Sequence, residues 1–437
     1  MKRFIFLSFL LWLSSPIAAA QGDTVRWTLS SCLDYALENN IQIRRGEVAL
    51  LSGIEDTREA RAQLFPSLSA SVSQSVVSYP SAEASGSNSY TGNYGLSAQW
   101  TIFNGLTRRK AIEQSELQNR IDEASVEENR DEIRIAIVQA YLQVMYAFEA
   151  VRIAENTVQV SEAELERSKG LFDAGALSRA DYAQIESQLA GDRYQLVAAQ
   201  ASLDNYKLQL KQLLELDIDD EMLFASSEVS ETEVMRLLPD KAEVYRVALE
   251  TKPQMTAARL GVESSELSVE QAKGGYLPTL ALSASVGTGH LSGGEPVGTQ
   301  MWNRLNGSAG LTLSIPIASN RKNRTAVNKA QLAVTDSELE LLSTEKELLK
   351  TVEGIWLDAI SAQSQYVSAV EKVRAAEESY ALVREQFDLG MSNTLELLTQ
   401  QNNLLSAQQE MLQSKYMAVM NIQLLNIYQN LPVDGAY

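Results

Sequence analysis

The sequence is poor in cysteine, histidine and proline. Its 437 residues include one cysteine, one histidine and nine prolines. A single cysteine, Cys32, excludes an intrachain disulfide. The single histidine, His290, lies in a Gly-rich loop without a second histidine or cysteine beside it, so we expect a surface residue and no metal site. No cofactor is predicted either, and stability must come from packing of apolar residues, which make up 45% of the chain.

Positive charge is also scarce. The formal net charge is −19, and it becomes −21 when Lys2 and Arg3 are removed with residues 1–20. Those twenty residues place two cations before an apolar run that ends in small residues at Ala20, the pattern of a signal peptide. Nucleic-acid binding requires clustered cations, so no nucleic-acid partner is expected. The mature chain is predicted to be exported.

Long apolar runs and catalytic motifs are missing as well. Beyond residue 20 no apolar run reaches the ~18 residues that a membrane helix needs, so strands must make any membrane crossing. Charged residues separate Cys32 from the signal peptide, which favours an ordinary helix cysteine over a lipid-attachment site. No phosphate-binding loop, dinucleotide fingerprint or nucleophile elbow is present, so no enzyme activity is predicted.

What the chain does contain is one pattern used twice. The segment LFPSLSAS at 64–71 matches YLPTLALS at 276–283, and FDAG at 172–175 matches FDLG at 387–390. The offset between the copies changes only within Gly-rich and Ser-rich loops, as expected for a duplicated unit. We therefore predict a first repeat over 21–215, a linker over 216–239 and a second repeat over 240–437.

Each repeat begins with a predicted helix, 29–61 or 240–273. After a proline, apolar and polar residues then alternate with a period of two, which is typical of a strand. Apolar residues alternate with serine, threonine and glycine over 68–76 and 94–102, and again over 280–286 and 309–317. This pattern indicates either half-buried hairpins of a soluble protein or membrane strands with an apolar and a hydroxylated face. Tyr94, Trp100 and Trp302 flank these strands, where membrane-interface aromatics would lie, although packing explains Trp100 equally well.

Two very long helices follow the strands. Residues 105–169 and 320–385 contain no proline and carry apolar residues at coiled-coil spacing. About 65 residues make a rod of roughly 100 Å. Gly175 and Gly390 are predicted to end these helices in left-handed turns, and Ser178 and Asn393 to cap the returning helices. Each repeat should therefore end in a helix-turn-helix tip.

The whole pattern resembles the TolC-like outer-membrane efflux protein family. The resemblance extends from about Leu29 to Asn430 and rests on the proline-preceded strands, the strand exits at 100–105 and 315–320, and the Phe-Asp-x-Gly tips. The second exit departs from it, with Ala318 and Ser319 in place of an aromatic and a glycine turn. The resemblance implies an α+β membrane protein: a coiled-coil barrel of long helices, and a transmembrane β-barrel shared by a homotrimer with four strands per protomer.

The resemblance also implies functional residues. Tips of this family meet a periplasmic adaptor protein, and carboxylates on the returning helix narrow the channel there. By position, the docking tips are Gly175, Ala176, Leu177 and Ser178 in the first repeat, and Gly390, Met391, Ser392 and Asn393 in the second.

Three positions are candidates for the pore constriction. Glu396 occupies the first acidic position, Thr399 stands where the resemblance would place a second carboxylate, and Asp181 is the first-repeat counterpart of Glu396. Each acid is alternatively an ordinary first-turn residue favoured by the helix dipole; for Glu396 the two explanations weigh equally, and for Asp181 we prefer the helix dipole. If three copies of Glu396 meet, their repulsion must be relieved by bound cations, by partial protonation or by pairing with a nearby base such as Arg179 or Arg384.

Two functions follow. The chain is either a passive export channel in the outer membrane of a Gram-negative bacterium, docked with an adaptor and an inner-membrane pump, or a periplasmic coiled-coil scaffold that spans no membrane. The strand pattern favours the channel, because one face suits membrane lipid and the other suits water.

Overall fold

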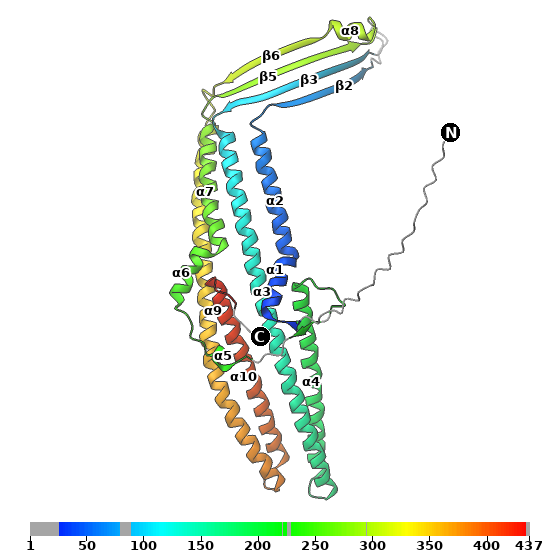
Figure 1. Cartoon of the computed structure of the whole chain (residues 1–437), viewed down its shortest axis with the longest axis vertical. Coiled ribbons are helices and arrows are strands. Elements are labelled where there is room, and N and C mark those ends of the chain that lie inside the picture. Colours follow the sequence, from blue (N-terminus) through cyan, green and yellow to red (C-terminus); the bar gives the residue numbers. More distant parts are fainter. Residues whose placement is uncertain (1–25, 79–88, 221, 225–228, 294, 434–437) are drawn as a thin grey trace, which may run out of the picture.

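The computed structural model describes residues 26–78, 89–220, 222–224, 229–293 and 295–433. The signal peptide predicted at residues 1–20 lies outside this range. The molecule is elongated, with a β-sheet at one end and two helical hairpins at the other (Figure 1). The two repeats lie side by side along its length.

The elements of the two repeats correspond in order within the described residues, apart from β1 in the first repeat and α8 in the second. The first repeat contains β1 (Arg26–Trp27), α1 (Leu29–Asn39), α2 (Ile41–Ala62), β2 (Ser67–Val77), β3 (Ser89–Asn104), α3 (Thr107–Asp173) and α4 (Arg179–Leu213). The connecting segment holds β4 (Leu223–Phe224) and α5 (Glu231–Val234). The second repeat contains α6 (Lys241–Thr251), α7 (Pro253–Gly274), β5 (Thr279–Leu291), α8 (Val297–Asn303), β6 (Asn306–Ser314), α9 (Lys322–Asp388) and α10 (Thr394–Tyr428).

The prediction of one continuous helix at the start of each repeat was wrong. Asn40 is extended between α1 and α2, where its side chain accepts a hydrogen bond from the Gln42 amide (2.8 Å) and donates one to the Leu213 carbonyl (3.1 Å). In the second repeat Lys252 is extended because Pro253 follows it, and Pro253 begins α7 at its first turn.

The sheet has the order β2-β3-β5-β6, and all neighbouring strands are antiparallel. Its register gathers the alternating apolar residues, Leu68 and Leu96 among them, on one face, and on the other face the hydroxyls of Ser69 and Ser97 lie 2.8 Å apart. The edges β2 and β6 have no further strand partner within the described ranges. The expected alternation to Ile317 was too long, since β6 ends at Ser314, before Pro316.

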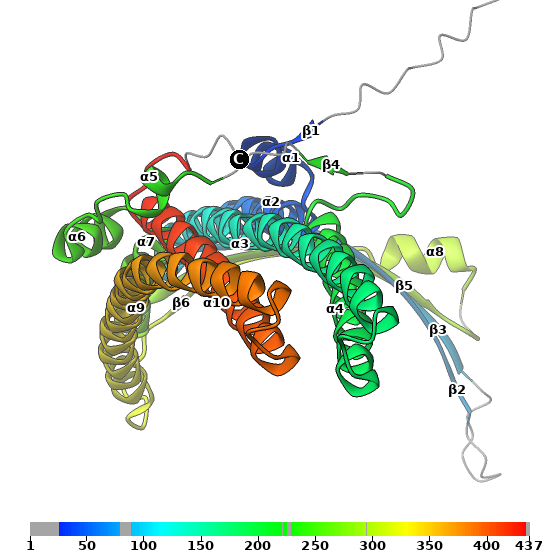
Figure 2. The ribbon, with the colours of Figure 1, turned by 90° about the horizontal axis from the view of Figure 1, so that it is seen from below.

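The long helices confirm the coiled-coil prediction. Helices α3 and α9 each contain 67 residues, about 100 Å of helix. They form a curved layer with α4 and α10 (Figure 2). Its largest core lies at mid-length, where α3 buries Ile137, Tyr141 and Val144 against α1 and α4. Cys32 of α1 is buried there, and burial raises the pKa of its thiol to about 12.

His290 is not the surface residue that was expected. It stands near the end of β5, its side chain is 6% exposed, and its ring stacks on Tyr94 at a centroid distance of 5.9 Å. Gly92 of β3 is the partner of His290 in the strand pairing. A Cβ atom added to Gly92 would lie 2.2 Å from His290 Cε1, so the ring occupies the space of a side chain at position 92. The expected loop is part of strand β5, and α8 follows that strand and is bonded to it through the Thr288 hydroxyl.

Candidate functional site at the hairpin tips

The two hairpin tips have the same backbone geometry. We call residues 175–178 the first tip and residues 390–393 the second tip. Gly175 and Gly390 both have a φ of +74°, which confirms the predicted left-handed turns. The next residue bonds back to the long helix in each case, from the Ala176 amide to the Leu171 carbonyl (2.9 Å) and from the Met391 amide to the Gln386 carbonyl (2.8 Å). This is the Schellman arrangement, in which the left-handed glycine satisfies the last helical carbonyls.

Side-chain caps start both returning helices, as predicted. Ser178 accepts a hydrogen bond from the Asp181 amide (3.1 Å), and Asn393 accepts one from the Glu396 amide (2.9 Å). Each acid is therefore the third residue of its helix, where the positive end of the helix dipole favours a carboxylate. The Ser178 hydroxyl also donates to the Asp181 carboxylate at 2.6 Å.

Glu396 and Thr399 lie on the exposed side of α10. The Ser392 hydroxyl donates a hydrogen bond to the Glu396 carboxylate (2.8 Å), and the Thr399 hydroxyl donates to the Leu395 carbonyl (2.7 Å). Asp181 is half-buried on α4. Within one protomer, nothing brings Glu396 and Asp181 onto a common binding site.

Neither predicted base pairs with Glu396 of its own protomer. Arg179 stacks over the rings of Phe172 and Tyr182, and its guanidinium is 3.5 Å from Glu186. Arg384 points instead into the interior between α9 and α3, where its Nε lies 2.8 Å from Glu164 Oε1. Within one protomer both arginines thus have other partners, Glu186 for Arg179 and Glu164 for Arg384, and their pairing with Glu396 between copies stays a prediction.

Glu164 was missed by sequence reasoning. Its buried carboxylate lies on α3, and burial raises its pKa even though Arg384 opposes that shift. A second ion pair, Arg167 with Asp388, also joins α3 to α9. These four charges connect the first hairpin to the second close to the tips. No local pattern distinguishes them from the many exposed charges of the long helices.

A buried polar network lies further from the tips than these ion pairs. Ser161 of α3 donates to Asp192 of α4 (2.5 Å) and accepts from Gln401 of α10 (2.7 Å). Gln188 holds the other oxygen of Asp192 at 2.9 Å. Burial raises the pKa of Asp192 despite these hydrogen bonds. Three helices from both repeats are thus joined by side chains that are hydrogen-bonded to one another.

The surfaces of the two tips differ. Apolar side chains are exposed at and beside the second tip, where Leu389, Met391 and Leu395 are each about two-thirds exposed. At the first tip, Leu177 is half-buried and contacts an apolar cluster that contains Phe387 and Leu397. The more exposed apolar surface is therefore on the second tip.

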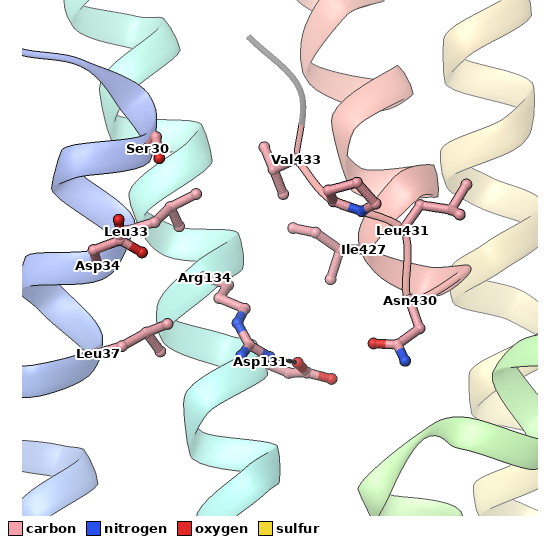
Figure 3. Close-up of a pocket in the computed structure, with 11 residues that line it drawn as sticks. Ser30, Leu33, Asp34, Leu37, Asp131, Arg134, Ile427, Asn430, Leu431 and Val433 are labelled. Atoms are coloured by element: carbon pink, nitrogen blue, oxygen red, sulfur yellow. Dashed lines mark hydrogen bonds and ion pairs between the residues drawn. The ribbon is translucent and has the colours of Figure 1, made fainter.

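A pocket at mid-length offers an alternative site. It has a volume of about 400 Å³ and lies between α1, α3 and the end of α10 (Figure 3). Two of its three charged residues are already paired with each other, because Asp131 accepts hydrogen bonds from Arg134 (2.8 Å) and from the buried Lys252 (2.7 Å). Within the described ranges, no cluster of three or more His, Cys, Asp or Glu side chains is arranged to hold a metal ion.

The fold and its tips define a membrane channel protomer that combines strands at one end with long helical hairpins at the other. No helix in the described part of the chain has both the length and the apolar character needed to cross a membrane. The family model for outer membrane efflux proteins matches residues 32–215 and again 244–427, one match for each repeat.

Individual relatives agree with this match. The outer membrane efflux protein BepC of Brucella suis is 21% identical over 93% of this chain and 86% of its own length. The outer membrane protein TolC of Escherichia coli is 22% identical over 96% of this chain and 85% of its own length. The solved structure of CusC has a TM-score of 0.78 at 16% identity, and the match covers 93% of this chain and 92% of that one.

The chain belongs to the outer membrane efflux protein family. It is an outer membrane efflux channel protein, so the channel interpretation is confirmed over the periplasmic scaffold. Members of this family are transport proteins rather than enzymes.

Proposed function

We propose that three copies of this chain form one passive export duct. The observation that carries the proposal is the sheet, which has an apolar face, a hydroxylated face and two unpaired edges at β2 and β6. Unpaired strand edges are intolerable in lipid, and four strands are too few to close a barrel. Joining β6 of one copy to β2 of the next removes every edge and encloses a water-filled lumen lined by hydroxyls.

The helices extend the duct on the other side of the membrane. Roughly 100 Å of α3 and α9 lead from the sheet to the tips, a length suited to the periplasm. The chain contains no nucleotide-binding motif that would supply energy. We therefore assign the tips to a periplasmic adaptor, through which an inner-membrane pump drives export. The exposed Leu389, Met391 and Leu395 supply an apolar contact for that adaptor at the second tip.

The sheet assignment is tested on the edge strand β6. Leu311 and Thr312 are neighbours that point to opposite faces. Leu311→Arg should block insertion into the outer membrane, because an arginine facing lipid costs about 2–4 kcal/mol near the bilayer midplane. Thr312→Arg, its matched control, should insert and form channels, since its side chain faces water. Equal insertion of both variants would contradict the assignment.

Assembly is tested by crosslinking in detergent. The parent chain should give a stable trimer, and the Thr312→Arg variant should do so too. A protein that yields only monomers or dimers would refute the shared barrel.

We further propose that Glu396 narrows the channel as a ring of three carboxylates. Like charges around an axis favour bound cations or partial protonation, as in the selectivity filters of cation channels. Glu396→Gln should reduce the preference for cations and the block by divalent cations in planar bilayers. Asp181→Asn is the control and should leave both unchanged. Thr399→Asp should strengthen the block by completing a second ring, and unchanged recordings for all three variants would exclude a pore role.

A further inference from the structure

We propose that α8 is a membrane anchor, which lies against the lipid-facing side of the sheet and contacts lipid at the boundary between headgroups and acyl chains through Trp302. This inference rests on the proposed function, because it requires the apolar face of the sheet to face lipid. It concerns the end of the strands that is remote from the helices (Figure 1).

Strand register shows that α8 covers the apolar face. Thr288 and His290 of β5 have the same parity as Leu282 and Val286, so all four side chains project from one face. The Thr288 hydroxyl donates a hydrogen bond to the Met301 carbonyl in α8. His290 is buried on the same side, with its ring against those of Tyr90 and Tyr94. Figure 2 shows α8 on the convex side of the sheet, away from the tunnel.

A hydrogen-bonded clamp holds the helix in this position. Gln300 is the buried residue of α8. Its side chain accepts a hydrogen bond from the Leu291 amide (2.9 Å) and donates to the carbonyls of Leu291 (3.0 Å) and Glu295 (2.6 Å). A helix of 7 residues is too short to be stable alone, so these contacts fix its orientation.

The reason for a cover lies in the sheet itself. Polar residues interrupt the apolar face near this end, where Gln74, Thr288 and His290 project from it, with Val76 beyond Gln74. His290 Nδ1 is buried and has no hydrogen-bond partner, so exposure of this ring to acyl chains would leave a polar atom in lipid. Helix α8 shields this polar end and presents its own outer surface.

That outer surface has the composition of a membrane interface. Trp302 is 77% exposed, and Val297 and Leu305 beside it are about half exposed. Arg304 is also exposed and is the cation nearest to them in the sequence. An aromatic side chain with neighbouring apolar residues and a cation suits the boundary between headgroups and acyl chains.

The spacing along the strands supports this depth. Trp100 lies on the same face at the opposite end of the strands and pairs with Leu282. From Leu282 to His290 the strand rises about 27 Å at about 3.4 Å per residue, which is about 21 Å along the membrane normal at a tilt of about 40°. Barrels of outer membranes have an apolar band about 25 Å tall with aromatic residues at both borders. Trp100 therefore lies near one border of such a band and His290 near the other, and α8, bonded to Thr288, lies at the His290 end.

Tryptophan quenching by brominated lipid tests the proposal in the full-length protein reconstituted into phosphatidylcholine vesicles. Subtracting the emission of the Trp302→Phe variant from that of the parent gives the emission of Trp302 alone. The Trp100→Phe variant gives the emission of Trp100 in the same way. Trp356→Phe is the matched control, because Trp356 lies on α9 far from the sheet and bonds the Pro239 carbonyl (3.0 Å).

We expect lipid brominated near the headgroup to remove about half or more of the Trp302 emission, since an interfacial aromatic lies about 5–10 Å below the headgroup boundary. Lipid brominated near the chain end should remove less, and the Trp356 emission should not change. Quenching of Trp100 without quenching of Trp302 would overturn the anchor and leave the channel assignment intact. If neither is quenched, the sheet is not in lipid and the proposed function itself fails.

Discussion

Replacing Gly390 with alanine should weaken the second tip without affecting the first. Gly390 has a φ of +74°, and an added Cβ would meet no atom within 4 Å. The penalty is therefore purely conformational, about 1–2 kcal/mol for an L-residue in the left-handed region. Gly170, an exposed residue in the right-handed helix α3 near the first tip, also has open space around it. Gly170→Ala should instead stabilise its helix by about 0.5–1 kcal/mol.

Hydrogen exchange reports this difference locally. The amides of Gly390 and Met391 bond the carbonyls of Phe387 (3.0 Å) and Gln386 (2.8 Å), and they exchange when the turn opens. A loss of 1–2 kcal/mol should accelerate their exchange by about 5- to 30-fold. The equivalent amide of Ala176 at the first tip should not change in this variant, and Gly170→Ala should slow it.

The same strain connects the tip to function. Gly390→Val adds a β-branched side chain, which is less tolerated at positive φ, and should abolish adaptor binding and export while trimers still assemble in the membrane. Unchanged exchange in Gly390→Ala would refute the strain argument. Normal adaptor binding and export by Gly390→Val would show that the tips are not the docking surface.

Two further predictions concern buried charges. Lys252→Met should destabilise the protein by about 1.5–3 kcal/mol, because a charged hydrogen bond to Asp131 is lost from a side chain that is 6% exposed; Lys241→Met removes an exposed ion pair and should cost under about 1 kcal/mol. Equal shifts of the thermal midpoint would contradict this difference. Burial raises the pKa of Asp192, so its contribution to stability is complete below about pH 4 and is lost as pH rises through the folded pKa. Denaturant midpoints from pH 4 to 7 should therefore fall less in Asp192→Asn than in the parent, whereas the control Asp204→Asn, an exposed position on α4, should follow the parent.

The tips and the rods were predictable because their rules are local. A left-handed glycine, the cap three residues beyond it and an uninterrupted coiled-coil spacing each depend on a few neighbouring residues. The predicted turns at Gly175 and Gly390 and the two long helices agree with the structure. Because the pattern of turn and long helix occurs twice in the sequence, each repeat supports the assignment of the other.

The errors arose where a residue's partner is distant in the chain. Asn40 ends a helix because its side chain reaches the Leu213 carbonyl, 173 positions away. Within one protomer Arg384 pairs with Glu164, which sequence reasoning missed, because α3 brings that buried carboxylate to within 2.8 Å. His290 is buried where strand pairing brings its ring against Tyr90 and Tyr94 of β3, about 200 positions earlier in the chain. The sequence by itself determined the repeats, the rods, the turns and the two-faced strands. Only the tertiary structure decided which charges pair and which polar groups are buried, since both depend on segments brought together by folding.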